Sequence, residues 1–146
     1  MCPAPISKNN KRGFIIPIGG GEDRENEMHI HRKFVGLAGA ENAEIVIVPT
    51  ASELDNIGPY YEDIFQTIGV KKVVFLPIDS REDCNNPRFT ELLEKATGIF
   101  LTGGNQLRLS TILGGTLIAQ TIRRRNAAGV PVAGTSAGAS IMSEHM

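Results

Sequence analysis

The stretch Val132-Ala133-Gly134-Thr135-Ser136-Ala137-Gly138-Ala139 decides how the rest of the sequence is interpreted. It places the pattern G-x-S-x-G between an apolar run and a run of small residues. A sharp strand-to-helix turn with this pattern, a nucleophile elbow, exposes a serine hydroxyl at the top of a sheet. The pattern predicts Ser136 as a nucleophile and the amide of Ala137, at the helix start, as a donor to an oxyanion. The alternative is a serine that only caps the last helix.

Outward from this stretch, short apolar runs alternate with helical patterns. The runs predict strands that are buried on both faces, at Phe14–Ile18, Glu44–Val48, Val73–Leu76, Gly98–Leu101 and Val130–Ala133. The intervening stretches predict helices at roughly Glu25–Ala40, Pro59–Ile68, Arg88–Ala96 and Asn105–Asn126, the last broken at Gly114-Gly115. Strands that alternate with helices predict an α/β fold, a parallel sheet flanked by helices. Residues 1–12 are expected to be a flexible N-terminus, and residues 13–146 to be part of one α/β domain.

Glycines cluster where three of the predicted strands end. They are Gly19-Gly20-Gly21, Gly103-Gly104, and Gly134 with Gly138. In an open parallel sheet, ligands bind beyond the carboxyl ends of the strands. Tight turns alone explain any one cluster, but three at one edge favour a binding or catalytic site. The turn after the fourth strand offers the amide of Gly104 and the side chains of Asn105 and Gln106.

Composition excludes several classes of protein. The 146 residues carry a formal net charge of −1, which argues against a nucleic-acid binder that works by bulk electrostatics. No apolar run approaches the roughly 18–20 residues of a membrane span, and the N-terminus lacks the apolar core of a secretory signal. These observations predict a cytoplasmic protein. Neither a metal-ligand spacing nor a P-loop occurs, so we expect no metal and no cofactor.

These motifs together resemble the cyanophycinase family. The resemblance rests on Gly134–Ala139 with Thr102-Gly103-Gly104-Asn105-Gln106, on Ile18–Glu22 and on Ile47–Ser52. It implies a fold like that of class I glutamine amidotransferases (flavodoxin-like). It also implies a serine peptidase, related to α-aspartyl dipeptidases, that hydrolyses cyanophycin. This polymer is a polyaspartate that bears arginine on each side-chain carboxyl, and the product is a β-aspartyl-arginine dipeptide.

The resemblance also implies roles for single residues. Ser136 matches the nucleophile, the amides of Gly104 and Ala137 match the oxyanion hole, and Gln106 and Asn105 match the substrate pocket. The chemistry is acyl transfer through a serine ester, with no metal or cofactor. We expect Asp23, and with it Glu22, to contact the guanidinium of the substrate because both lie at the same sheet edge.

The sequence departs from the family after the serine. The resemblance implies a catalytic acid and a histidine base that follow the nucleophile, yet only ten residues follow Ser136. On a continuous helix His145 lies about 13 Å along the axis from Ser136, too far to act as its base. His29 and His31 are expected on a surface or in helix packing. We therefore expect the N-terminal portion of a longer enzyme, truncated just after the elbow.

The lack of a base near Ser136 is also compatible with a site shared between chains or with an inactive protein. A second chain, or a second copy in a homodimer, could complete the site, or the protein could be an inactive homologue. A narrower aspartyl dipeptidase and a non-catalytic binding or scaffold protein with the same fold are the alternative functions.

Overall fold

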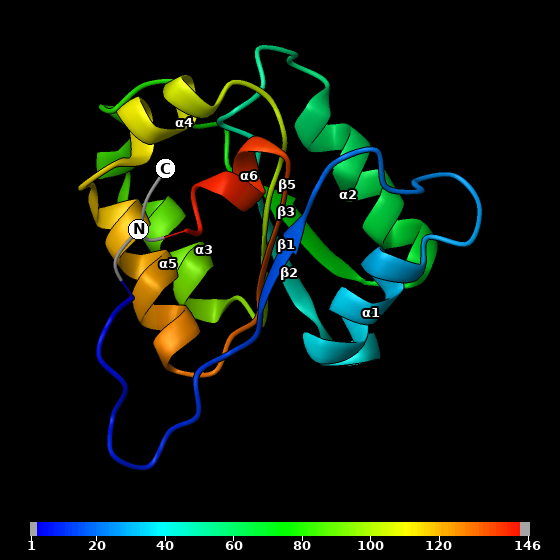
Figure 1. Ribbon diagram of the computed structural model, residues 1–146, viewed down its shortest axis with the longest axis horizontal. Helices are drawn as coiled ribbons and strands as arrows, with labels where there is room; N and C mark the ends of the chain where they lie inside the picture. The colour runs from blue at the N-terminus through cyan, green and yellow to red at the C-terminus, as the bar shows by residue number, and fades with distance from the viewer. Residues whose placement is uncertain (1–2, 144–146) are drawn as a thin grey trace.

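A computed structural model describes residues 3–143 and contains a five-stranded parallel sheet with helices on both faces (Figure 1). The strands are β1 (Ile15–Ile18), β2 (Glu44–Val48), β3 (Lys72–Phe75), β4 (Gly98–Leu101) and β5 (Val132–Thr135). Their order in the sheet is β1-β5-β4-β2-β3, and every neighbouring pair is parallel. The predicted α/β fold is confirmed.

Helices form a layer on each side of the sheet (Figure 1). One face is covered by α1 (His29–Leu37) and α2 (Ile57–Ile68). The other is covered by α3 (Pro87–Lys95), α4 (Gln106–Leu113), α5 (Leu117–Ala127) and α6 (Ala137–Ser140). Two 3-10 turns, η1 (Ala40–Asn42) and η2 (Asp83–Asn85), join these elements. Ile45 and Ile47 of β2 enter the first core and Val46 and Val48 the second, which explains why the strand is a continuous apolar run.

The strand order brings the three glycine clusters together. β5 lies between β1 and β4, with Gly134 opposite Pro17 on one side and Leu101 on the other. The loops that follow β1 and β4 therefore flank the turn that follows β5. This placement is the one that the sequence predicts from the carboxyl ends of parallel strands.

The fifth strand begins two residues later than predicted, at Val132 rather than Val130. The amide of Val130 donates to the carbonyl of Arg125, at 3.0 Å, in the turn that ends α5. Pro131 has no amide hydrogen to donate to a neighbouring strand. Val132 is the first residue that can pair with the β1 side of the sheet, and its amide donates to the carbonyl of Phe14 at 2.9 Å.

The first helix is shorter than the predicted range Glu25–Ala40. The carboxylate of Asp23 accepts hydrogen bonds from the amides of residues 25–28, at 2.8 to 3.1 Å. Met28 has φ 50°, which is outside the helical region. These contacts hold the segment as a loop, so α1 begins only at His29.

The other helical predictions hold within a few residues. The long stretch breaks at Gly114-Gly115 into α4 and α5, as predicted. Asn86 caps α3 by accepting a hydrogen bond from the amide of Arg88, with Pro87 in the first turn. The last helix, α6, ends at Ser140, so it is shorter than the continuous helix considered for the distance to His145. Glu144 and His145 lie outside the described residues.

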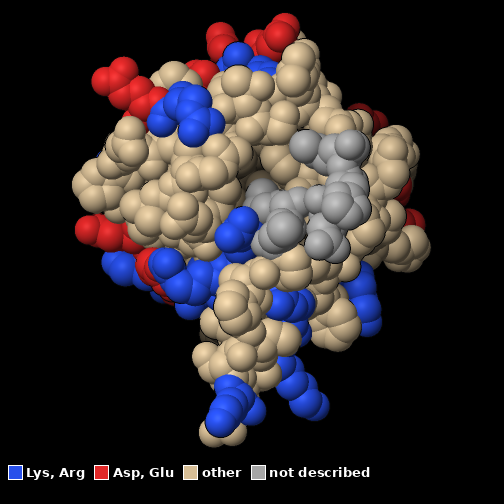
Figure 2. All heavy atoms as spheres, turned by 60° about the vertical axis from the view of Figure 1, so that its left-hand side comes forward, with Lys and Arg blue, Asp and Glu red and all other residues tan. Residues whose placement is uncertain are grey.

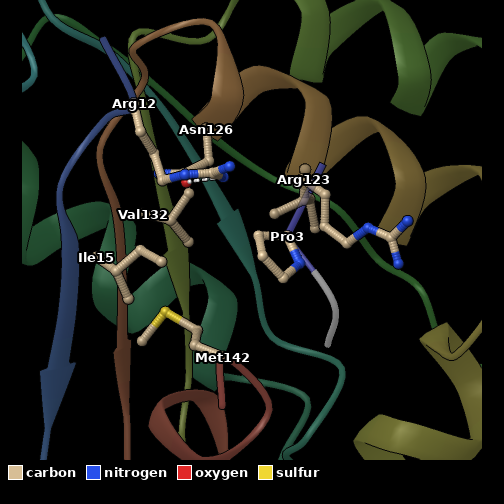
Figure 3. A pocket seen from close by; sticks show the side chains of 8 residues that line it. Pro3, Arg12, Ile15, Arg123, Asn126, Val132 and Met142 are labelled. Atoms are coloured by element: carbon tan, nitrogen blue, oxygen red, sulfur yellow. Dashed lines mark hydrogen bonds between the residues drawn. The ribbon is translucent and has the colours of Figure 1, made fainter. Parts of the chain in front are cut away.

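One edge of the sheet is β1, where Ile15 is 46% exposed and Phe14, just before the strand, is 65% exposed. Beside it is a hollow of about 220 Å³ between β1, α5 and the segment after α6 (Figure 3). The lining residues are Pro3, Arg12, Ile15, Ile122, Arg123, Asn126, Val132 and Met142. Arg12 donates to the side chain of Asn126 at 3.2 Å and to the carbonyl of Ala4, so Arg12 links the N-terminal segment to α5. Their predicted flexibility stays a prediction.

Charged side chains of both signs occur on the surface. Figure 2 shows uncharged atoms over much of one face, with acidic and basic side chains together toward its upper rim and mostly basic ones toward its lower part. Among residues 3–143, no helix has the length and apolar character needed to cross a membrane.

Candidate functional site: a strained serine at the carboxyl end of β5

Ser136 connects the last strand to the last helix in an unusual backbone conformation. β5 ends at Thr135 and α6 begins at Ala137, and Ser136 between them has φ 51° and ψ −113°. A non-glycine residue in this region carries strain of about 1–3 kcal/mol. Its amide donates to the carbonyl of Ile18 at 2.9 Å, and its side chain is exposed. The sharp strand-to-helix turn that the sequence predicts at Ser136 is therefore present.

The glycines on either side of Ser136 allow a close approach of backbone to backbone. A Cβ atom on Gly138 would lie 2.3 Å from the carbonyl oxygen of Leu101 in β4. A Cβ atom on Gly134 would lie 2.4 Å from the carbonyl oxygen of Gly138. Both distances are far below van der Waals contact, so α6 can fold back against β4 and β5 only when these side chains are absent.

The serine faces a hollow of about 300 Å³. The residues that line it are Ile18, Gly19, Gly104, Gln106, Ser136, Ala137, Ala139 and Ser140. Four of the predicted site residues, Ser136, Gly104, Ala137 and Gln106, therefore share one space. Gly104 has φ 144°, and its Cβ would lie 2.1 Å from the carbonyl oxygen of Ala51. Only glycine fits this turn, which places its backbone beside the serine.

Two backbone amides of the hollow are available to a ligand. Within residues 3–143, no hydrogen bond of the chain uses the amide of Gly104 or that of Ala137. Ala137 is the first residue of α6, and the amides of a first helical turn have no partner inside the helix. Amide donors aimed at a reaction centre stabilise the negative oxygen that forms during acyl transfer.

The two remaining predicted residues, Asn105 and Asp23, have hydrogen-bond partners within the chain. Asn105 caps α4, because its side-chain oxygen accepts from the amide of Arg108 at 3.0 Å. Asp23 accepts from the four amides of residues 25–28, which organise the loop after β1. Neither residue is among those that line the hollow around Ser136.

Glu22 lies in the protein interior, contrary to the expectation that it contacts the substrate. Its side chain is 1% exposed. One carboxylate oxygen accepts from the hydroxyl of Thr135 at 2.8 Å, and the other from the hydroxyl of Tyr61 at 3.0 Å. The Nε of Arg24 is 3.3 Å from this second oxygen, an ion pair without hydrogen-bond alignment. Arg24 also lies over the Tyr61 ring, with its guanidinium 5.7 Å from the ring centroid.

These contacts determine the protonation state of Glu22. Burial raises the pKa of its carboxyl, but hydrogen bonds from its own amide, from Thr135 and from Tyr61, with the charge of Arg24, outweigh burial. The pKa consequently falls below the ordinary value of 4.5, and Glu22 is a carboxylate at neutral pH. The sequence contains no signal for this cluster because its members are up to 113 residues apart.

The two histidines among the described residues are not at the hollow. His31 is fully buried, with its ring centroid 5.8 Å from that of Phe100, and neither ring nitrogen has a hydrogen-bond partner. His29, the first residue of α1, is exposed. Residues 3–143 also contain no group of three or more His, Cys, Asp or Glu side chains placed to hold a metal ion.

A strained serine at the carboxyl end of a strand in a parallel sheet, beside two free amides, is the arrangement of hydrolases that form a serine ester. The sequence model of Peptidase family S51 matches residues 15–146, and the chain belongs to this family.

Named relatives support this assignment. The chain is 45% identical over 134 residues to a cyanophycinase of Trichormus variabilis, covering 90% of the chain and 45% of that protein. It is 40% identical over 141 residues to a cyanophycinase of Geminocystis herdmanii, covering 95% of the chain and 52% of that protein. The chain thus spans about half the length of the curated relatives it matches.

Solved structures share the fold. A peptidase from an acI-B1 actinobacterium superposes with a TM-score of 0.76 at 28% identity, covering 90% of the chain and 57% of that structure. A putative peptidase E protein from Listeria monocytogenes superposes with a TM-score of 0.65 at 22% identity, covering 88% of the chain and 60% of that structure. The second likeness concerns the fold alone.

Replacement of Gly138 by alanine tests the close approach at the elbow. The new Cβ would collide with the Leu101 carbonyl, so Gly138→Ala should lower the free energy of unfolding by about 1–3 kcal/mol or more. Gly36 lies exposed in α1 with open space around it, so Gly36→Ala is the matched control and should add roughly 0.5–1 kcal/mol. Chemical denaturation of the protein expressed from its complete reading frame measures both. Equal stabilities for the two variants would contradict the packing at the elbow.

The buried carboxylate gives a prediction on the pH dependence of stability. Glu22→Gln keeps the size of the side chain but loses its charge, and should cost about 1–3 kcal/mol of unfolding free energy at pH 7. The pKa of Glu22 is lower in the folded state than in the unfolded chain. The stabilisation that its carboxylate gives the folded state is therefore complete above pH 4.5. It is lost as the pH falls through the lower folded value. The difference between wild type and Glu22→Gln should therefore shrink on acidification.

Denaturation curves from pH 7 down to pH 3 measure this difference. Glu91 is exposed on α3, so Glu91→Gln serves as the control and should follow the wild type throughout. A Glu22→Gln difference that stays constant over this range would show that the carboxylate charge contributes nothing.

Proposed function

We propose that this chain carries the nucleophile and the oxyanion hole of a serine peptidase that hydrolyses cyanophycin to β-aspartyl-arginine dipeptides. The observation that supports this proposal most is that Ser136, at φ 51°, is exposed in a hollow that it shares with the free amides of Gly104 and Ala137. Support comes also from relatives named cyanophycinase, 38–45% identical over 90–97% of the chain.

The proposed reaction is acyl transfer in two steps. The hydroxyl oxygen of Ser136 attacks the carbonyl carbon of a backbone peptide bond, and the amides of Gly104 and Ala137 bind the negative oxygen that develops. The peptide bond then breaks, the amine leaves with a proton, and an ester remains on Ser136. Water attacks this ester, which releases the carboxylic acid product and restores the hydroxyl.

A base has to accept the proton of Ser136. None of the eight residues that line the hollow is a histidine, aspartate or glutamate. The family resemblance implies a histidine and an acid that follow the serine, so we assign proton transfer to groups beyond the described residues. A continuation of this chain, a second chain or a second copy would supply them.

The polar residues around the hollow take the substrate in this proposal. Gln106, at the start of α4, lines the hollow and offers both a donor and an acceptor. The side-chain nitrogen of Asn105 is left for substrate after its oxygen caps α4. Asp23 acts on the substrate through the loop that its carboxylate organises. We place the reaction in the cytoplasm, the compartment that the sequence predicts.

Replacement of the nucleophile tests the proposal. In the protein expressed from its complete reading frame, Ser136→Ala should lower the rate of cyanophycin hydrolysis by about a thousandfold or more, because no ester can form. Ser110 is a half-buried serine of α4 that does not line the hollow, so Ser110→Ala is the matched control and should keep the wild-type rate. Mass spectrometry of the products should find β-aspartyl-arginine.

The remaining outcomes distinguish the alternative functions. Cleavage of short aspartyl dipeptides but not of the polymer would indicate an aspartyl dipeptidase. A wild-type protein that cleaves neither substrate would indicate a non-catalytic homologue. Undiminished hydrolysis by Ser136→Ala would rule out Ser136 as the nucleophile.

A further inference from the structure

A buried carboxylate contacts the residue that precedes the strained serine. Glu22 ends the glycine loop that follows β1, and its side chain is closed off from solvent. Its two oxygens contact different parts of the molecule, one the end of β5 through Thr135 and the other α2 through Tyr61. A carboxylate in the interior requires such partners, because an unpaired buried charge is strongly unfavourable.

The contact to β5 reaches the residue that precedes the nucleophile. The hydroxyl of Thr135 donates to Glu22 at 2.8 Å, and Thr135 is itself 2% exposed. A hydrogen bond to an ionised acceptor is shorter and stronger than one between neutral groups. It fixes the rotamer of Thr135, and with it the backbone that leads into Ser136.

A second contact links the same loop to Ser136 itself. The Ser136 amide donates to the carbonyl of Ile18 at 2.9 Å, just before the glycine loop. Between the two contacts the loop lies against the serine, because a Cβ atom on Gly20 would be only 3.6 Å from that of Ser136. The loop is thus bonded to two successive residues, to Ser136 before its glycines and to Thr135 after them.

We propose that Glu22 is a positioning residue that acts through Thr135 to hold Ser136 in its reactive conformation. The inference rests on the proposed function in that it takes Ser136 as the nucleophile. The φ of Ser136 is disfavoured, so surrounding contacts must maintain it. Without the Glu22–Thr135 hydrogen bond, the turn relaxes toward ordinary backbone angles and the Ser136 hydroxyl leaves the oxyanion site.

Three substitutions of threonine separate positioning from general stability. Thr135→Val removes the hydroxyl and keeps the shape, whereas Thr135→Ser keeps the hydroxyl. Thr121 in α5 is also fully buried, but its hydroxyl has no hydrogen-bond partner, so Thr121→Val makes the same change where no contact is lost. All three are made in the protein expressed from its complete reading frame, with the folded fraction of each measured by thermal unfolding.

The reactivity of Ser136 toward a fluorophosphonate probe is the first readout. Loss of a hydrogen bond to a charged group should slow labelling of folded Thr135→Val by about tenfold or more. Thr135→Ser should label within about threefold of wild type, since the hydroxyl donor is retained. Thr121→Val should label at the wild-type rate. On cyanophycin, Thr135→Val should lower kcat and leave KM nearly unchanged, because the substrate pocket is intact.

Equal labelling rates for Thr135→Val and Thr121→Val would overturn the proposal and leave Glu22 a purely structural residue. The probe does not depend on cyanophycin, so the two proposals can fail separately. A wild-type protein that is labelled at Ser136 but does not cleave cyanophycin refutes the substrate, and the labelling rates then decide the role of Glu22. A wild-type protein that is not labelled refutes both.

Discussion

The left-handed backbone of Ser136 is the constraint on which the rest of this site depends. A serine at φ 51° is held between a strand and a helix that approach each other more closely than any side chain would permit. Gly138 passes so near Leu101 that a single added carbon would collide with its carbonyl oxygen. The strain and the close packing together keep the hydroxyl exposed above the sheet, with the amide of Ala137 beside it.

The order of the strands determines which loops lie next to the turn at Ser136. Because β5 lies between β1 and β4, the loops after those two strands flank Ser136. The β4 loop contributes the amide of Gly104, and the β1 loop contributes the carboxylate of Glu22, which accepts a hydrogen bond from Thr135, the residue before Ser136. The apolar layers on both faces support these loops, so the geometry around Ser136 and the packing of the core depend on each other.

Much of this could be predicted from the sequence, because strands and elbow have local signals. Apolar runs identify all five strands, and G-x-S-x-G identifies Ser136 with the amides around it. What the sequence does not show depends on contacts between distant residues. Nothing near Glu22 indicates that it is buried against Tyr61 and Thr135. Likewise, the sequence does not show that the Asp23 carboxylate accepts hydrogen bonds from four amides. These bonds hold residues 25–28 as a loop, so α1 begins later than the sequence predicts.

The most direct test of Ser136 as the nucleophile is to locate the covalent adduct that a fluorophosphonate forms with the protein expressed from its complete reading frame. Peptide mapping by mass spectrometry should find one modified residue, Ser136, because among residues 3–143 only this hydroxyl combines exposure, strain and adjacent free amides. An adduct on the neighbouring Ser140 or Thr135 instead, or no adduct on an intact and folded protein, would contradict the assignment of Ser136 as the nucleophile.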